Sequence, residues 1–313
     1  MSCYTRTEDD PLSKKTEPAC RNACGVHDIY CCGSHVKIDE KGITILTEPA
    51  VTYCPLHESL YGTKKIDAQA VKKSVETKIG GFGFCCRDRD FSFDSIVAYG
   101  ASEMMSVWLD KGLIDCAVVV CDGAGTVITN NGKLVQGIGA RLTGIIKTSP
   151  IREVIGHIER NGGAVLDKTE ATIDQAAGVK HAFMAGAKHV AVSVASFQAK
   201  AISDIRRLEK TEGKAAVIFS VCNTLAKKSD VKHIVKADIA CASASTILRN
   251  AVGSRALLQV GVTIPVYALT EKGKGLVLDY LAVFKDKLVA FRTGKLPYEI
   301  KNRGPERRGI PHE

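Results

Sequence analysis

Apolar and polar residues alternate near the start of the chain in a pattern that predicts a β-hairpin. Residues 35–38 alternate, residues 43–46 form a β-branched run, and Glu40-Lys41-Gly42 between them supplies a turn. A period of two is the spacing of a strand with one buried face, and a glycine in the connection favours a hairpin. A further short strand over residues 50–53 is expected to end at Cys54.

The next pattern has the period of a helix. Val71, Val75 and Ile79 recur every four residues, so they share one face of a helix. Asp67 stands where an N-cap side chain would accept the first free backbone N–H groups. We expect Gly80-Gly81 to end this helix, with a loop after it.

From about residue 95 onward, short apolar runs alternate with helical patterns. The expected strands are 95–99, 117–120, 164–166, 189–194, 215–221, 238–240, 256–260 and 266–269. The expected helices are 102–111, 151–160, 175–185, 199–209, 231–236, 245–251 and 274–283. Alternation of this kind is typical of an α/β fold with a mostly parallel sheet covered by helices.

The chain length predicts more than one such unit. A chain of 313 residues corresponds to about two domains of ~150 residues. We therefore expect two mostly parallel, Rossmann-like α/β units, preceded by the small β-hairpin and helix segment. The expected divisions are a Cys-rich extension over 1–34, a first unit over 35–150, a second over 151–295 and a basic tail over 296–313.

Composition excludes several classes of protein. The chain is 45% hydrophobic and 25% charged, which excludes disorder, a collagen and a coiled-coil rod. The first residues are polar and no apolar run of about 18 residues occurs, so we expect no signal peptide and no membrane span. A cytoplasmic protein with thiols reduced or bound to metal is expected.

The net charge of +9 is partly concentrated in the tail. Such a charge can attract nucleic acid, acidic proteins or anionic metabolites, although a solvated surface is the simpler interpretation. The chain contains no zinc-finger spacing, no RNP1-type strand and no basic zipper. We therefore expect no nucleic-acid partner.

Thiols recur at the carboxyl ends of the expected strands, where ligands bind in open α/β sheets. Cys121, Cys222 and Cys241 each follow a strand, and Cys54 and Cys85 lie on loops of the first unit. Thiolates are soft ligands suited to iron–sulfur clusters, zinc or copper. The sequence therefore predicts a metal site formed by Cys54, Cys85, Cys121 and Cys241, the alternative being that these thiols are buried and inert.

A denser set of ligand-type residues lies in the N-terminal extension. It consists of Cys20, Cys24, His27, Cys31 and Cys32, at spacings that allow neighbours to reach one tetrahedral ion. A zinc site is one interpretation of this set. A tail with incidental thiols is the other, because the set contains no paired CxxC element.

Glycines and polar residues near the expected strand ends suggest a ligand-binding crevice. Glycine lets the backbone approach an anionic group, although tight turns explain the glycines equally well, and Arg141 could pair an anion or make a structural salt bridge. No His is paired with a candidate nucleophile. The candidate ligand-binding residues are Ser102, Glu103, Asp122, Gly123, Gly125, Thr126, Gly137, Gly139, Arg141, Asn223 and Ser243.

Several separate motifs together resemble one known family. They are 51–56 (VTYCPL), 82–85 (FGFC), 99–105 (YGASEMM), 120–129 (VCDGAGTVIT), 135–141 (VQGIGAR), 240–243 (ACAS), 258–261 (LQVG) and 264–270 (IPVYALT). Over about residues 35–281 the chain resembles methanogenesis marker protein 8. The resemblance implies a setting in methanogenesis or related anaerobic one-carbon metabolism, and it implies no catalytic residue. Residues 1–34 depart from the family pattern.

A shorter stretch, residues 105–120, resembles a segment of the F420-reducing hydrogenase beta-subunit family. That family binds flavin and iron–sulfur clusters, so the likeness adds flavin as a candidate cofactor by analogy.

Three functions remain as hypotheses at this point. The first is a redox or iron–sulfur-handling protein of anaerobic one-carbon metabolism. The second is a non-catalytic assembly or accessory factor that docks on a larger enzyme through its extension and tail. The third is a metal-free enzyme that binds a nucleotide or flavin. The partner is a small molecule or a protein, and a homo-oligomer is compatible with all three.

Overall fold

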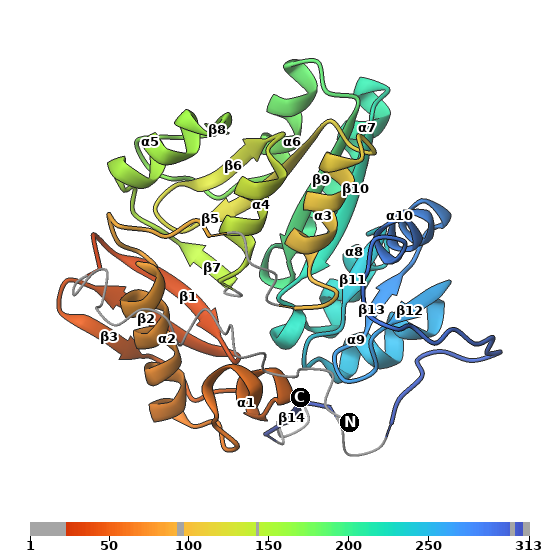
Figure 1. Cartoon of the computed structure of the whole chain (residues 1–313), viewed down its shortest axis with the longest axis horizontal. Coiled ribbons are helices and arrows are strands. Elements are labelled where there is room, and N and C mark those ends of the chain that lie inside the picture. The colour runs from red at the N-terminus through yellow and green to blue at the C-terminus, as the bar shows by residue number, and fades with distance from the viewer. Residues whose placement is uncertain (1–22, 93–96, 142–143, 301–303, 309–313) are drawn as a thin grey trace.

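The computed structural model describes residues 23–92, 97–141, 144–300 and 304–308. Figure 1 shows a large twisted sheet with helices on both faces, beside a smaller sheet formed by the N-terminal part of the chain. No helix within the described residues is both long and apolar enough to cross a bilayer. The α/β fold class predicted from the alternating pattern is confirmed.

The large sheet has eight strands in the order β12-β13-β11-β10-β9-β5-β6-β8. Its centre is parallel, from β11 through β10 and β9 to β5, and the strands on either side of this centre pair antiparallel. The strands are β5 (Cys116–Cys121), β6 (Gly125–Thr129), β8 (Gly163–Val165), β9 (His189–Ala195), β10 (Ala215–Val221), β11 (Ile239–Cys241), β12 (Leu258–Val260) and β13 (Val266–Ala268). The carboxyl ends of the four parallel strands therefore lie at one edge.

Two layers of helices cover this sheet because successive side chains of a strand point to opposite faces. Ala117 and Val119 of β5 pack in one core with α3, α4, α5 and α10, whereas Val118 packs in the other with α6, α7, α8 and α9. The first layer is α3 (Ala101–Asp110), α4 (Gly132–Gly139), α5 (Arg152–Arg160) and α10 (Glu271–Leu281). The second is α6 (Gln175–Met184), α7 (Lys200–Glu212), α8 (Val231–Ile234) and α9 (Thr246–Ala251).

The smaller sheet has the order β3-β2-β1-β7 and its own core. Its strands are β1 (His27–Cys31), β2 (Ser34–Asp39), β3 (Gly42–Ile45) and β7 (Gly144–Lys147). The core packs β1, β2 and β7 against α2 (Ala68–Phe82), and β4 (Val51–Tyr53) and α1 (Pro55–Tyr61) lie between β3 and α2 in the chain. The predicted hairpin over 35–46 is confirmed as β2 and β3.

The predicted domain divisions need three corrections. Residue 34 is not a boundary, because β1 pairs with β2 on one side and with β7 on the other. Residue 150 does not separate two sheets, because β5 from the first predicted unit pairs in parallel with β9 from the second. The segment from 296 is not simply a free tail, because β14 (Glu306–Arg307) pairs with β4.

Glycines lie inside helices in two places where the sequence favoured a helix end or a turn. The helix begins at Asp67 as predicted, with the Asp67 carboxylate accepting from the N–H of Ala70, but α2 continues through Gly80-Gly81 and ends at Gly83. Gly137 and Gly139 belong to α4 rather than to a turn. Residues 97–99, predicted as part of a strand, form a turn, and residues 95 and 96 lie outside the described part.

Candidate functional site

Two adjoining cavities lie where the parallel strands end. This is the edge at which open α/β sheets bind ligands. Both cavities are lined by Val221 and Cys222 at the end of β10, by Phe197 after β9 and by Gly144 of β7. The start of α3, at Gly100 and Ala101, also borders both. The smaller sheet thus supplies one wall of a site whose other walls come from the large sheet.

The larger cavity, of about 310 Å³, is lined by four thiols. Cys32 comes from the turn between β1 and β2, and Cys54 is the N-cap residue of α1. Cys222 follows β10 and Cys241 ends β11. We refer to Cys32, Cys54, Cys222 and Cys241 together as the cavity thiols.

Backbone strain is concentrated on the same cavity. Cys32, Cys222 and Ser243 have φ values of 51°, 51° and 49°, in the left-handed region that non-glycine residues seldom adopt. All three line the larger cavity. Strained residues of this kind cluster at functional sites, where the surrounding structure holds them in place.

Asn223 holds Ser243 and the neighbouring Cys241 in place. Its side-chain amide donates to the carbonyl of Cys241 at 2.8 Å, and its backbone N–H donates to Ser243 Oγ at 3.1 Å. Ser220 Oγ donates in turn to the Asn223 side-chain oxygen at 3.0 Å. Asn223 is fully buried and therefore supports the cavity wall without lining it.

Burial keeps most of the cavity thiols protonated. It raises the pKa of Cys54 and of Cys241, and it raises that of Cys222 to about 12. The cause is the loss of solvation of the thiolate in an apolar surrounding. A metal cofactor would have to displace these protons, because only the thiolate is a ligand.

A buried lysine interacts electrostatically with Cys32 of the larger cavity. Lys78 of α2 is 5% exposed, and although burial disfavours its charge, Tyr61 and the thiols of Cys31, Cys32 and Cys222 raise its pKa overall. A hydrogen bond from Cys32 lowers the pKa of Cys31 well below its ordinary range, and the Lys78 charge acts in the same direction. A positive charge thus sits close to two of the cavity thiols.

His57 of α1 belongs to the same buried group. It is 5% exposed, its ring centroid lies 4.8 Å from that of Tyr61, and burial lowers its pKa. Neither ring nitrogen has a hydrogen-bond partner among the described residues. This neutral imidazole does not border either cavity.

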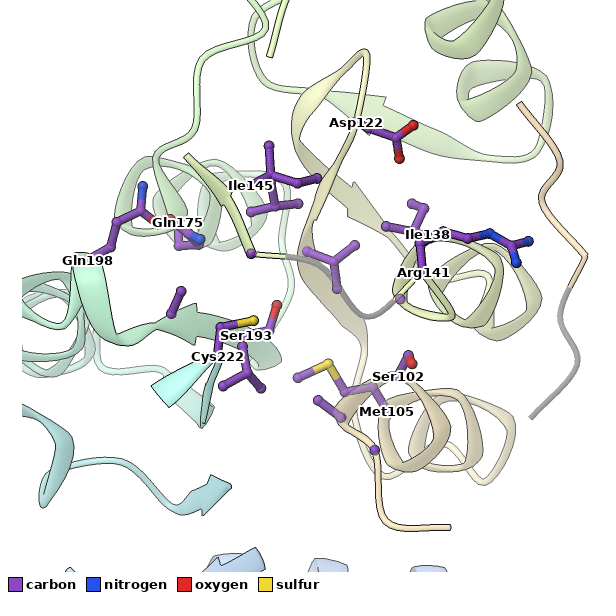
Figure 2. A pocket seen from close by; sticks show the side chains of 18 of the residues that line it. Ser102, Met105, Asp122, Ile138, Arg141, Ile145, Gln175, Ser193, Gln198 and Cys222 are labelled. Atoms are coloured by element: carbon purple, nitrogen blue, oxygen red, sulfur yellow. The ribbon is translucent and has the colours of Figure 1, made fainter. Parts of the chain in front are cut away.

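The smaller cavity, of about 160 Å³, has a more polar wall (Figure 2). Ser102, Glu103, Arg141, Gln175 and Gln198 line it. Ser102 Oγ donates to the Glu103 carboxylate at 2.9 Å, and that carboxylate also accepts from Gln136 at 3.1 Å. The predicted residues Ser102, Glu103, Asp122, Gly139 and Arg141 meet here.

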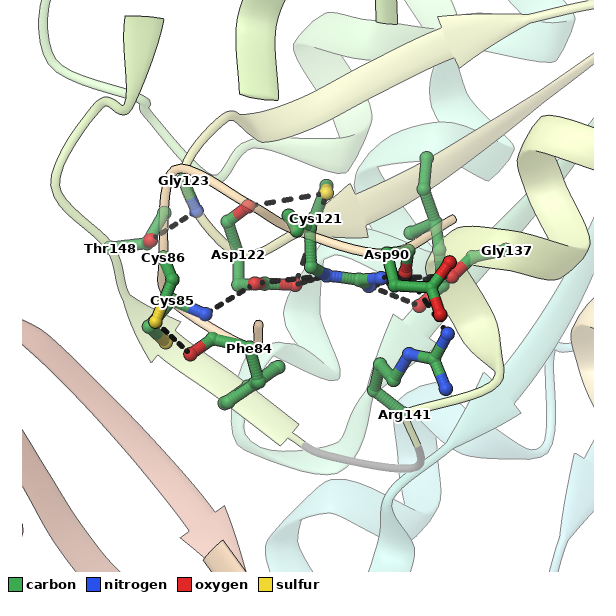
Figure 3. Close-up of polar contacts among 12 residues, drawn as sticks. Phe84, Cys85, Cys86, Asp90, Cys121, Asp122, Gly123, Gly137, Arg141 and Thr148 are labelled. Atoms are coloured by element: carbon green, nitrogen blue, oxygen red, sulfur yellow. Dashed lines mark hydrogen bonds and ion pairs between the residues drawn. The ribbon is translucent and has the colours of Figure 1, made fainter. Parts of the chain in front are cut away.

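Next to this cavity lies a buried ion pair between Arg89 and Asp122 (Figure 3). The two side chains are 0% and 2% exposed, and Arg89 Nε lies 3.0 Å from Asp122 Oδ1. The backbone N–H of Cys85 donates to Asp122 Oδ2 at 2.7 Å, and the Cys121 thiol donates to the Asp122 carbonyl at 3.2 Å. Burial raises the pKa of both thiols, and because neither borders a cavity they have the character of core residues.

The four cysteines predicted as one metal site are therefore divided. Cys54 and Cys241 line the larger cavity, whereas Cys85 and Cys121 pack around Asp122 and line neither cavity. In the described ranges, no three His, Cys, Asp or Glu side chains are placed to share one metal ion. The predicted set of four omitted Cys222, although this thiol also follows a strand, and Cys32 was assigned to the N-terminal set; the structure places both beside Cys54 and Cys241.

The N-terminal zinc set is divided as well. His27 uses both ring nitrogens, with Nδ1 at 2.7 Å from Thr148 Oγ1 and Nε2 at 2.8 Å from the carbonyl of Cys24. Cys24 packs against the core of the large sheet, whereas Cys31 lies in the core of the smaller sheet. Cys20 lies outside the described residues, and zinc binding stays a prediction.

The glycine-rich segments have structural explanations. Gly123 and Gly125 turn the chain between β5 and β6 with φ values of 78° and 70°. A Cβ on Gly125 would lie 2.1 Å from the carbonyl oxygen of Ala171, and one on Gly137 would lie 2.3 Å from that of Phe91. Thr126 is buried, with its hydroxyl accepting from the N–H of Asp174 at 2.8 Å. Close packing of chain segments accounts for these residues without a phosphate.

Comparison with known proteins gives an archaeal family. The family model described as "Uncharacterized protein conserved in archaea (DUF2099)" matches residues 27–282. The chain is also 37% identical over 248 residues to "Uncharacterized protein MJ0054" of Methanocaldococcus jannaschii, covering 79% of this chain and 86% of that protein. The match begins at the first residue of β1, in agreement with the place of β1 inside the fold.

Proposed function

This chain belongs to the family described as an uncharacterized protein conserved in archaea, and from the chemistry of its cavities we propose that it is a redox protein that holds an iron–sulfur cluster. The observation that carries the proposal is that four thiols from distant parts of the chain border one cavity at the carboxyl edge of the parallel strands. Such thiols are suited to soft metals. The proposed ligands are the cavity thiols.

Four thiols on the wall of one cavity match the ligand number of a [4Fe–4S] cluster. A mononuclear zinc site needs its sulfur atoms about 2.3 Å from one point. The described residues contain no three ligand-type side chains placed in that way. A [4Fe–4S] cluster is held by four cysteine thiolates around a volume instead, which is what thiols spread over the wall of a cavity can provide.

The charge distribution is also compatible with this cofactor. Thiolate ligands bring negative charge into a buried site, and buried charge needs compensation. Lys78 supplies a buried positive charge within electrostatic reach of Cys32 and Cys222. The raised pKa values of Cys54, Cys222 and Cys241 imply that cofactor loading releases protons and is favoured by higher pH.

The metabolic setting of the proposal is anaerobic one-carbon metabolism. It is supported by the resemblance of residues 35–281 to methanogenesis marker protein 8. That identification is more specific than the archaeal family match. An accessory factor without its own redox chemistry is the alternative that the following experiment separates.

The test is the iron and acid-labile sulfide content per chain after strictly anaerobic purification, with a visible spectrum of the same sample. We expect iron and sulfide in matched amounts. Single Cys→Ser changes at Cys32, Cys54, Cys222 and Cys241 should each reduce the iron content. Cys116→Ser is the matched control, because Cys116 is a buried thiol of β5 that borders neither cavity.

Two results would contradict the proposal in different ways. Absence of iron before and after reconstitution would exclude the cluster and favour an accessory role. Loss of iron in Cys85→Ser and Cys121→Ser, with retention in Cys32→Ser and Cys222→Ser, would restore the ligand set predicted from the sequence.

A further inference from the structure

The smaller cavity is lined by two glutamines, and one of their amide oxygens is buried without a partner. Gln175, the first residue of α6, is 3% exposed and lines the cavity. The side-chain oxygen of Gln198 is buried without a hydrogen-bond partner among the described residues. Figure 2 places both residues on the same side of the cavity as Ser193 and Cys222, opposite Arg141. Buried polar groups are almost always hydrogen-bonded, so the unpartnered Gln198 oxygen points to a ligand, and Gln175 lines the same cavity.

The charged groups around this cavity are already engaged. Asp122 is paired with Arg89. The Glu103 carboxylate accepts hydrogen bonds from Ser102 and from Gln136. The guanidinium of Arg141 donates to the carbonyl of Asp90 at 3.0 Å and stacks over the Phe82 ring. What the cavity offers a ligand is therefore hydrogen bonding from neutral amides rather than a charge.

The volume of the cavity suits a small group such as a single ring. A cavity of roughly 150 Å³ accommodates one benzene ring, and the smaller cavity measures about 160 Å³. Phe197 borders it and presents an aromatic ring. At Gly144 the absence of a side chain keeps the passage to the thiol-lined cavity open, because a Cβ there would lie 3.2 Å from the Phe197 ring and 3.6 Å from Cys222 Sγ.

We infer that the smaller cavity binds the edge of a planar heteroaromatic ring in which an N–H lies next to a carbonyl or ring-nitrogen acceptor. Each glutamine amide carries one acceptor and a donor group, so it can pair with such an edge in two hydrogen bonds. The Phe197 ring offers the face for stacking. Any further part of the molecule would extend past Gly144 toward the cavity thiols. This inference names the class of substrate or cofactor for the same site as the proposed function, but it does not depend on the cluster.

Uracil is a suitable probe, because it is a single ring with alternating N–H and carbonyl groups. Benzene is the comparison ligand, because it has the ring shape without a polar edge. Binding to the full-length protein is measured by saturation-transfer NMR and by titration. We expect millimolar binding of uracil, weakened about five- to tenfold by Gln175→Met and by Gln198→Met, since each change removes one polar partner. Benzene should bind the variants no more weakly than the unchanged protein.

The control is Gln69→Met, which makes the same change on the exposed face of α2 and should leave uracil binding unaltered. Uracil that fails to bind the unchanged protein, or that binds both cavity variants as well as it binds the control, would overturn the inference. Iron content is measured on the same preparations. Uracil binding by protein that contains no iron would contradict the proposed cluster and support this inference. Iron in protein that does not bind uracil would support the cluster and contradict this inference.

Discussion

The buried amide of Gln175 leads to a prediction about stability that is independent of any ligand. Replacing Gln175 by Met keeps the length of the side chain and removes the polar group. A buried polar group without a partner costs about 1–3 kcal/mol in protein mutational data. The side chain is 3% exposed. We therefore expect Gln175→Met to stabilise the ligand-free protein by about 1 kcal/mol, which is the lower end of that range.

The same change at Gln136 should have the opposite sign. Gln136 is 4% exposed, and its amide donates to the Glu103 carboxylate at 3.1 Å. Removing it leaves a buried carboxylate with one donor fewer, and hydrogen bonds to charged groups contribute about 1.5–3 kcal/mol. We expect Gln136→Met to destabilise the protein by about 2 kcal/mol. Burial is thus matched between the two positions, and the Gln136 amide is the one that donates to a buried carboxylate.

Thermal unfolding in parallel with urea titration measures both changes. For a chain of this size, 1 kcal/mol corresponds to a shift of about 2 °C or somewhat more. Gln175→Met should therefore melt about 2 °C higher and Gln136→Met about 4 °C lower, with exposed Gln69→Met unchanged. The reasoning fails if Gln175→Met lowers the melting temperature as Gln136→Met does, because Gln175 would then contribute to folding as a paired group.

Three further predictions concern the surroundings of the site. Asp122→Asn leaves Arg89 buried without its counter-charge and should destabilise the protein by about 3–5 kcal/mol in thermal unfolding; a loss below 1 kcal/mol would contradict the ion pair. Gly125→Ala forces a Cβ to 2.1 Å from the Ala171 carbonyl at a φ of 70°, so we expect a loss of about 3 kcal/mol or more, and a neutral change would show that the turn can move. Burial raises the pKa of Cys222 to about 12, so the thiol is protonated at neutral pH and the thiolate fraction increases only as the pH rises. In metal-free protein, the rate of Cys222 alkylation, measured by peptide mass mapping, should therefore still increase above about pH 10. A rate that reaches a plateau near pH 9 would indicate an ordinary thiol.

Local patterns identified most of the elements because they report on short stretches of chain. The helix after Asp67 and the hairpin over 35–46 each follow from a period and a turn residue, and both are confirmed. The errors arose where tertiary packing overrode a local signal. Gly137 lies inside α4 rather than in a turn. Packing requires a glycine there, because a side chain would collide with the carbonyl of Phe91. The strand β1 lies in the segment predicted as an extension, although it alternates buried and half-buried residues and pairs with the adjacent β2; its other partner, β7, lies more than a hundred residues away in the chain.

The candidate site was predictable only in part. The rule that ligands bind at the carboxyl ends of parallel strands pointed to the correct edge, and Cys54, Cys241 and Ser243 do border the larger cavity there. Cys85 was grouped with them from sequence alone, yet its backbone N–H binds Asp122 and its thiol is fully buried. A glutamine carries no distinctive motif, so Gln175 and Gln198 give no signal in the sequence, and only the structure places both on the wall of the smaller cavity.

The sequence by itself determined the α/β class, the approximate position of most helices and strands, and the abundance of thiols near strand ends. These properties depend on periodicity and residue type within short windows, where the chemistry of neighbours dominates. Only the folded chain shows that β1 and β7 form one wall of the site, that Cys32 and Cys222 join Cys54 and Cys241 around one cavity, and that the Gln198 side-chain oxygen is buried without a partner beside it. Such proximity follows from the order of strands in the sheet and from long connections between them, and the identities of sequence neighbours do not encode it.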